Sequence, residues 1–255
     1  MQAIGNFSEA AAGIIGGALA LISLRTPFYA QAIIMVFPIL LAFSLTEPTK
    51  HHHQKKKASL KEVVGIVKFS LHHHKEVKWL ILYSGVVGAS TLTLVWFIQP
   101  YLILTGLPLA FFGLFWALLN LSVGVFSLTS HVYEKKLGRK KSLVSLILLV
   151  FLGYFLLAIF PSIWTIIVLF IFYFVRGISG PVFNDYINKI ISSDMRATVL
   201  SVKSLMVRLI FSIIGPFIGY LADVFTLPTA LLAAGVIFAV IGGTSLFFLH
   251  KHRVL

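Results

Sequence analysis

The stretch Glu134-Lys135-Lys136-Leu137-Gly138-Arg139-Lys140-Lys141 separates two long apolar segments, residues 107–130 and residues 143–160. Five of its eight residues are basic, and neither flanking segment contains a Lys, Arg, Asp or Glu. A helix that crosses a membrane needs about 17–25 mostly apolar residues, and both segments have that length. The stretch therefore predicts a basic turn between two transmembrane helices.

The composition of the 255-residue chain excludes several classes of protein. Hydrophobic residues make up 58% of it and charged residues 11%, against about 45–50% and about 25% in soluble domains. A soluble fold of this size could not hide so much apolar surface from water. The net charge of +13 comes mostly from clusters between apolar segments, so no nucleic acid is expected as a partner. The absence of cysteine excludes disulfides, iron–sulfur clusters and thiolate metal sites.

Eight apolar segments are long enough for transmembrane helices, and their continuity excludes the alternating pattern of a membrane β-barrel. They are residues 4–24, 28–45, 79–104, 107–130, 143–160, 163–183, 197–221 and 227–249. The polar segments between and after these spans would lie on alternating sides of the membrane. Of the 21 basic residues, 17 lie in the segments on one side, and the opposite side has Arg25 alone. The positive-inside rule assigns the basic side to the cytoplasm. We therefore expect an all-α integral protein of the cell membrane, embedded in the lipid bilayer, with eight spans and both termini in the cytoplasm.

One break is much longer than the others and divides the chain. Residues 47–78 are rich in Lys and His, and residues 59–71 carry apolar side chains at helical spacing. Such a pattern is typical of an amphipathic helix on the inner membrane surface. We expect two spans in residues 1–46, a cytoplasmic linker in residues 47–78 and six spans in residues 79–255.

Three motifs resemble the major facilitator superfamily of membrane transporters. The basic turn is similar to the family's Asp-Arg-x-Gly-Arg-Lys loop, with Lys135 at the Asp position and Glu134 one place earlier. Residues 176–181 and 196–201 resemble its tenth helix and the loop after it, and residues 215–219 resemble its eleventh helix. The resemblance implies helices five to twelve of a twelve-helix fold. These are the complete C-terminal half and the last two helices of the N-terminal half, with helices one to four absent.

This resemblance implies a secondary transporter that moves a small molecule by alternating access, as a permease or an efflux carrier, with H+ or Na+ as the coupling ion. The chain would be a partial transporter that works with the missing helices or with an oligomer partner. A non-transporting membrane scaffold is the alternative. A membrane enzyme is disfavoured, because the apolar segments contain neither a nucleophile–base pair nor a metal cluster. No catalytic residue, metal or cofactor is expected.

An internal repeat relates the first span to the seventh. Gly13 and Gly17 are spaced as Gly215 and Gly219 are, and Pro216 follows the first glycine of the later pair. Glycines four residues apart let two helices approach closely, and a separation of six spans fits two parallel six-helix halves. These residues therefore indicate helix packing.

Charged residues inside the spans are the first candidates for a substrate site, because a charge at the bilayer centre costs about 2.5–3.5 kcal/mol or more. Arg208 lies near the middle of its span, and Arg176 lies about two thirds of the way along its own. Either could bind an anionic substrate group or pair with an acid in the missing helices. The alternative is a side chain that extends along the helix to the membrane surface.

Polar and aromatic residues of the spans are further candidates for a substrate cavity, namely Gln99, Asn120, Trp96 and Tyr173. Trp and Tyr are also common at membrane interfaces, and Asn120 could instead form a hydrogen bond between helices.

The basic turn itself suggests a gating loop. Gly138 permits a tight turn, and Arg139 and Lys140 could pair with an acid at the end of a neighbouring helix, with Glu134 as the acid of the loop. Such pairing would hold one state of a rocking transporter, whereas positive-inside topology alone is the alternative.

Two histidine triplets, His51–His53 and His72–His74, lie in the linker among lysines. Imidazole is a common metal ligand, but the lysines repel cations and no cysteine accompanies the histidines. We expect a solvated loop there.

Overall fold

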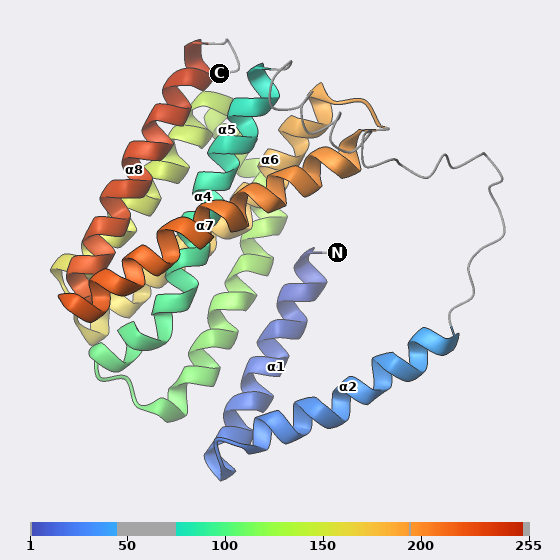
Figure 1. Ribbon diagram of the computed structural model, residues 1–255, viewed down its shortest axis with the longest axis vertical. Helices are drawn as coiled ribbons and strands as arrows, with labels where there is room; N and C mark the ends of the chain where they lie inside the picture. The colour runs from blue at the N-terminus through green and yellow to red at the C-terminus, as the bar shows by residue number, and fades with distance from the viewer. Residues whose placement is uncertain (1, 45–74, 194, 252–255) are drawn as a thin grey trace.

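The computed structural model describes residues 2–44, 75–193 and 195–251, and all regular structure in these ranges is helical (Figure 1). The long helices are α1 (Gln2–Ile22), α2 (Thr26–Ser44), α4 (Lys75–Leu104), α5 (Phe112–Ile159), α6 (Leu169–Ile190), α7 (Arg196–Val224) and α8 (Leu227–Lys251). Two short 3-10 helices, η2 (Leu109–Phe111) and η3 (Ile163–Val168), precede α5 and α6. The histidine triplets and the expected amphipathic helix of the linker lie outside the described residues.

The α5 helix turns back on itself at Gly138, within the predicted basic turn. Gly138 has φ 74° and ψ 163°, a conformation that glycine adopts readily because it has no Cβ. The Tyr133 hydroxyl before the turn lies 2.6 Å from the Ser145 hydroxyl after it, so the two arms of α5 lie side by side. These arms occupy the positions of the fourth and fifth expected spans.

Six described segments are long and apolar enough to cross a membrane. One of them, Leu109–Ile159, has 51 residues and includes the turn at Gly138, and α1 adds a shorter apolar stretch over residues 7–22. The all-helical membrane fold is therefore confirmed, whereas the number of eight crossings stays a prediction.

The core of the bundle lies between α4, α5, α6 and α8, and buried tyrosine hydroxyls join its helices. Tyr83 of α4 donates to the Leu143 carbonyl at 2.6 Å, and Tyr154 of α5 donates to the Ser90 carbonyl at 2.7 Å. Buried polar groups need partners, and here each partner lies on the other helix. These bonds fix α4 against the second arm of α5.

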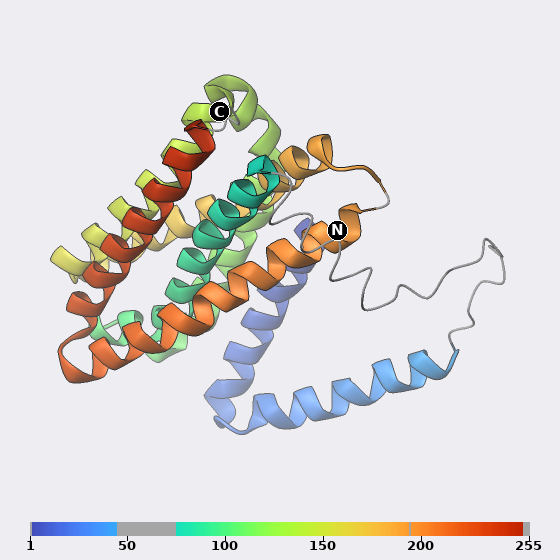
Figure 2. The same cartoon turned by 45° about the horizontal axis from the view of Figure 1, so that its top comes forward.

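The first two helices depart from this bundle (Figure 1). α1 lies against the first arm of α5, and α2 leaves α1 at a wide angle, as Figure 2 also shows. No residue of α2 is buried by the described part of the chain. α7 crosses α4 obliquely and exposes an apolar row of its own, made of Leu205, Leu209, Ile213 and Phe217. Helices α2 and α7 thus present apolar surfaces that the described residues leave uncovered.

Candidate functional site

A cleft of about 500 Å³ lies between α1 and the bundle of α4 to α8. Glu9 from α1, Asn120 from α5 and Arg176 from α6 line it beside the ring of Trp116. Its other lining residues are Ala12, Gly13 and Val95. We call this space the Glu9 cleft. It brings together Asn120 and Arg176, two of the residues predicted for a substrate cavity, and adds an acid to them.

Glu9 and Arg176 are the two charged residues of this cleft. They form no ion pair, since Lys189–Asp185 is the single ion pair of the described residues. Opposite charges that face one space still attract each other. Glu9 can therefore receive a proton, and Arg176 an anionic ligand, without a direct ion pair being broken.

Asn120 and Tyr173 are buried polar residues of the bundle interior. The Asn120 amide nitrogen donates to the Trp116 carbonyl of its own helix at 3.0 Å, so this bond does not join two helices. The Tyr173 hydroxyl has no hydrogen-bond partner among the described residues. A buried hydroxyl without a partner is uncommon, which keeps Tyr173 a candidate for contact with water or a ligand.

A second cleft, of about 360 Å³, lies between α4, α6 and α7. Three basic side chains line it, and no acidic residue of the described ranges does; we call it the basic cleft. The basic residues are Arg176, Lys203 and Arg208, and the hydroxyl-bearing residues are Ser84, Thr91, Ser179 and Ser204. Arg176 borders both clefts, so the two spaces share one guanidinium group.

The basic cleft collects every basic residue that lies within a predicted span. Sequence reasoning selected Arg176 and Arg208 but missed Lys203, because Lys203 lies near the cytoplasmic start of its span. A signal was present, since positions 203, 204, 207 and 208 share one face of a helix. Glu9 was missed as a site residue for the same reason, because it lies near the expected inner end of the first span.

The remaining two cavity candidates lie apart from these clefts. Gln99 lines a third space of about 270 Å³ between α1, α4 and α5, together with Gly13 and Gly17. Trp96 is 66% exposed and stacks on Phe211 of α7, with ring centroids 6.2 Å apart. Trp96 therefore lies at the contact of α4 with α7 and lines neither charged cleft.

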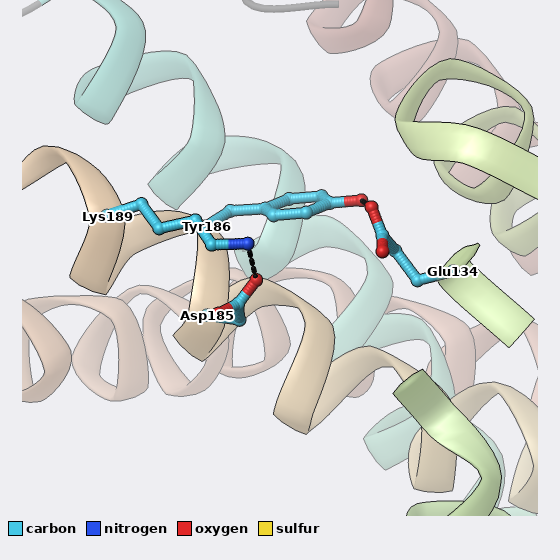
Figure 3. A network of polar contacts seen from close by, with 4 residues as sticks. All are labelled: Glu134, Asp185, Tyr186 and Lys189. Atoms are coloured by element: carbon cyan, nitrogen blue, oxygen red, sulfur yellow. Dashed lines mark hydrogen bonds and ion pairs between the residues drawn. The ribbon is translucent and has the colours of Figure 1, made fainter. Parts of the chain in front are cut away.

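A small polar network lies where the first arm of α5 reaches the basic turn and meets the C-terminal end of α6 (Figure 3). The Tyr186 hydroxyl donates to the Glu134 carboxylate at 2.9 Å. Lys189 pairs with Asp185 at 2.6 Å on the same helix, and both side chains are exposed. The hydrogen bond thus connects the two helices, whereas the ion pair lies within α6.

Arg139 takes a different partner from the acid expected for it. Its guanidinium lies over the ring of Tyr186, 4.5 Å from the ring centroid, and the hydroxyl of the same tyrosine donates to the Glu134 carboxylate. The Nε and Nη2 atoms of Arg139 are buried without a hydrogen-bond partner among the described residues. Lys140 is exposed. An ion pair of Arg139 or Lys140 with an acid is therefore absent from the described part of the chain.

The glycines of the internal repeat differ in their surroundings. A Cβ on Gly113 of α5 would lie 2.8 Å from the Gly13 carbonyl oxygen and 2.9 Å from the Gly17 Cα, so α1 and α5 meet backbone to backbone. On α7, Gly215 faces the ring of Phe211 one turn earlier, and Gly219 has no atom within 4 Å of its Cβ position. Pro216 lies inside the same helix. A role in helix packing for this later pair stays a prediction.

Helices that are long and apolar enough to cross a membrane surround clefts that are lined by charged side chains. This combination defines a helical membrane protein with charged groups between its helices. No group of three His, Asp or Glu side chains that could hold a metal ion occurs within the described ranges. The sequence model of the Major Facilitator Superfamily matches residues 1–216. The chain belongs to this superfamily, as the motifs of the basic turn, α6 and α7 predict.

Two solved structures share the fold. The fucose:proton symporter of E. coli matches with a TM-score of 0.58 and 19% identity, over 89% of this chain and 55% of the symporter. A bacterial homologue of the human lysosomal transporter Spinster, inward-facing and unoccupied, matches with a TM-score of 0.64 and 15% identity. That match covers 94% of this chain and 64% of the homologue. The chain thus spans less than two thirds of either structure, and no curated protein matches its sequence.

Proposed function

We propose that the protein is a secondary transporter that carries a small molecule by alternating access, as a permease or an efflux carrier. The Glu9 cleft carries this proposal, because Glu9 of α1 and Arg176 of α6 line one space between α1 and the bundle. In transporters built from two repeats, the substrate site lies near the midplane between the repeats. Charges within a membrane are costly and are usually functional, which favours transport over simple packing.

The contact beside the cleft suits a rocking movement. Gly13, Gly17 and Gly113 bring the backbones of α1 and α5 together, and the Trp116 side chain packs against Gly13. Small residues permit such close approach in membranes, and few rotamers need to change when the two helices tilt. The α1–α5 contact can therefore serve as a pivot.

For the coupling ion, the Glu9 cleft favours a proton over Na+. The Glu9 carboxylate can take up a proton without any other ligand, and protonation would remove its attraction to Arg176. A sodium ion would be repelled by the guanidinium of Arg176, which lines the same cleft. We assign the coupling proton to Glu9.

The polar network at the basic turn would serve as a gate. Arg139 stacks on Tyr186, and Tyr186 bonds to Glu134, so the end of α6 is held by residues on both sides of Gly138. These contacts would stabilise one state of the cycle. The unpartnered nitrogens of Arg139 offer donors to an acidic partner in the other state.

We infer the membrane orientation of the protein from the distribution of its basic residues, and its protein partners from its exposed apolar surface. The basic residues between the spans support a location in the cell membrane with both termini on the cytoplasmic side. The uncovered faces of α2 and α7 would contact further helices or a second copy of the chain, which would form the opposite wall of the substrate site. A membrane scaffold would leave these faces to other proteins and would carry no solute.

Membrane vesicles from cells that make the protein test the proposal. Labelled small molecules are offered to vesicles that contain a pH-sensitive dye, and vesicles without the protein are the control. We expect at least one solute to accumulate against its gradient and to move protons as it does. Vesicles that contain the folded protein but move no solute would favour the scaffold.

A further inference from the structure

The basic cleft concentrates positive charge without a described acid to balance it. Arg176, Lys203 and Arg208 line a space of about 360 Å³, and none of them forms an ion pair with a described residue. Cations that share a confined space repel one another, and each is costly within a membrane. A negative charge that enters the space would therefore be attracted by all three cations.

The neighbouring side chains do not supply that charge. The Lys203 ammonium donates to the side-chain oxygen of Asn184, which is neutral. Glu9 lies in the adjacent cleft beside Arg176, and Glu134 accepts from Tyr186 near the basic turn. No acid of the described ranges lines the basic cleft, so within these ranges its positive charge is open to an anionic ligand.

The α4 side of the cleft offers a different chemistry. The Ser84 hydroxyl donates to the Ile81 carbonyl at 2.9 Å, and the Thr91 hydroxyl donates to the Gly88 carbonyl at 3.0 Å. Because their protons are used within α4, their oxygens remain as hydrogen-bond acceptors. The cleft thus has cationic donors on α6 and α7 and neutral acceptors on α4, which fits a ligand with an acidic group at one end and hydroxyl groups at the other.

We propose that the basic cleft binds a small hydroxylated organic anion, whose carboxylate or phosphate is held by Arg176, Lys203 and Arg208. The inference rests on the proposed function and deepens it by naming the class of transported molecule. Guanidinium groups match both acidic groups with two parallel hydrogen bonds. The cleft has the size of a small-molecule site, about 300–1,000 Å³. Since Arg176 borders both clefts, the bound anion and the Glu9 carboxylate compete for one guanidinium.

The absence of native cysteine allows a direct test with a single introduced thiol. Ser204→Cys places it in the basic cleft, and Ala12→Cys places it in the Glu9 cleft as the matched control. The chain is inserted in phosphatidylcholine nanodiscs and treated with an anionic and a cationic thiosulfonate reagent of similar size. We expect the anionic reagent to react at least about tenfold faster at position 204, because a cleft of one sign of charge concentrates counter-ions. At position 12, where Glu9 and Arg176 offset each other, the two rates should be similar.

Charge removal and ligand protection complete the test. Arg208→Gln should reduce the ratio of the anionic to the cationic reaction rate at position 204 about fivefold. Arg25→Gln, which lies outside the cleft, should leave this ratio unchanged. Gluconate or glycerol 3-phosphate should slow modification, while the neutral glucose and glycerol should not. Equal rates for the two reagents, a preference insensitive to Arg208→Gln, or protection by neither anion would overturn the proposal.

A lipid headgroup is the other source of an anionic group. The same labelling in phosphatidylglycerol nanodiscs separates the two sources. If this lipid abolishes the preference and the soluble anions give no protection in phosphatidylcholine, the cleft is a lipid site and the proposal is wrong. The assay measures no transport, so its result is distinct from failure of the vesicle experiment.

Discussion

Glu9 on α1 and Arg176 on α6 line the same cleft, although they lie 167 residues apart in the chain. The domain assignment expected from the sequence puts them in different halves of the superfamily fold, with α1 in the N-terminal half and α6 in the C-terminal half. They form no ion pair, so the two charges balance across an open space. A proton on Glu9 would change that balance, and the first prediction follows from this.

Glu9→Gln removes the proton acceptor while it keeps the size of the side chain. In vesicles we expect solute-dependent proton movement to fall to the level of vesicles without protein, while exchange of solute across the membrane persists. Glu9→Asp should retain part of the proton movement. Full proton coupling in Glu9→Gln, measured with the dye, would show that another group carries the proton.

Arg208→Ala should abolish transport while the amount of protein in the membrane stays normal, because the substrate would lose a charged contact. Arg208→Lys should restore transport only in part, since an ammonium cannot replace the planar fork of a guanidinium. Uptake assays with matched protein amounts measure this. Normal transport by the alanine variant would mean that Arg208 only extends to the membrane surface.

Gly113→Ala tests the close contact of α1 with α5. The new Cβ would lie under 3 Å from backbone atoms of Gly13 and Gly17, so the helices must separate, at a cost of about 1–3 kcal/mol of folding free energy. Gly219→Ala is the matched control, because its Cβ meets no atom within 4 Å. Thermal unfolding of the purified chain in detergent should show a lower midpoint for the first variant alone. Equal midpoints would argue that α1 does not pack there.

Tyr186→Phe removes the hydrogen bond to Glu134 and keeps the ring beneath Arg139. We expect a loss of about 1–3 kcal/mol, typical of an unsatisfied partly buried acceptor, and a larger loss for Tyr186→Leu, which also removes the stacking. Lys189→Gln should have little effect, because an exposed ion pair contributes little. The same unfolding assay ranks the three variants. A loss as large for Lys189→Gln as for Tyr186→Phe would mean that the network does not depend on the tyrosine.

Reporter fusions test the topology. Fusions after Thr105 and Pro161 should report an external location, and fusions after Lys55 and Lys140 a cytoplasmic one, because the basic breaks lie on one side. A reversed or mixed pattern would contradict the eight-span assignment. The fusion after Lys140 also tests the turn at Gly138, which requires the two arms of α5 to cross separately.

The sequence by itself determined the class, the positions of the helices and the family. Apolar length and the placement of charge are local properties, so segments such as residues 79–104 and 227–249 could be recognised without knowledge of their neighbours. The turn at Gly138 was predictable for a similar reason, since a glycine in a short basic break has few alternatives.

Only the tertiary structure decided which residues share a cleft. Arg176 was recognisable as a charge in a span, but its proximity to Glu9 and Lys203 depends on how α1 and α7 pack against α6, which no local pattern encodes. Packing likewise separated Trp96 from the clefts and placed Arg139 on Tyr186 instead of on an acid. The physical reason is that burial in a membrane is set by each segment's own composition, whereas contacts between helices depend on the fit of surfaces that are distant in the chain.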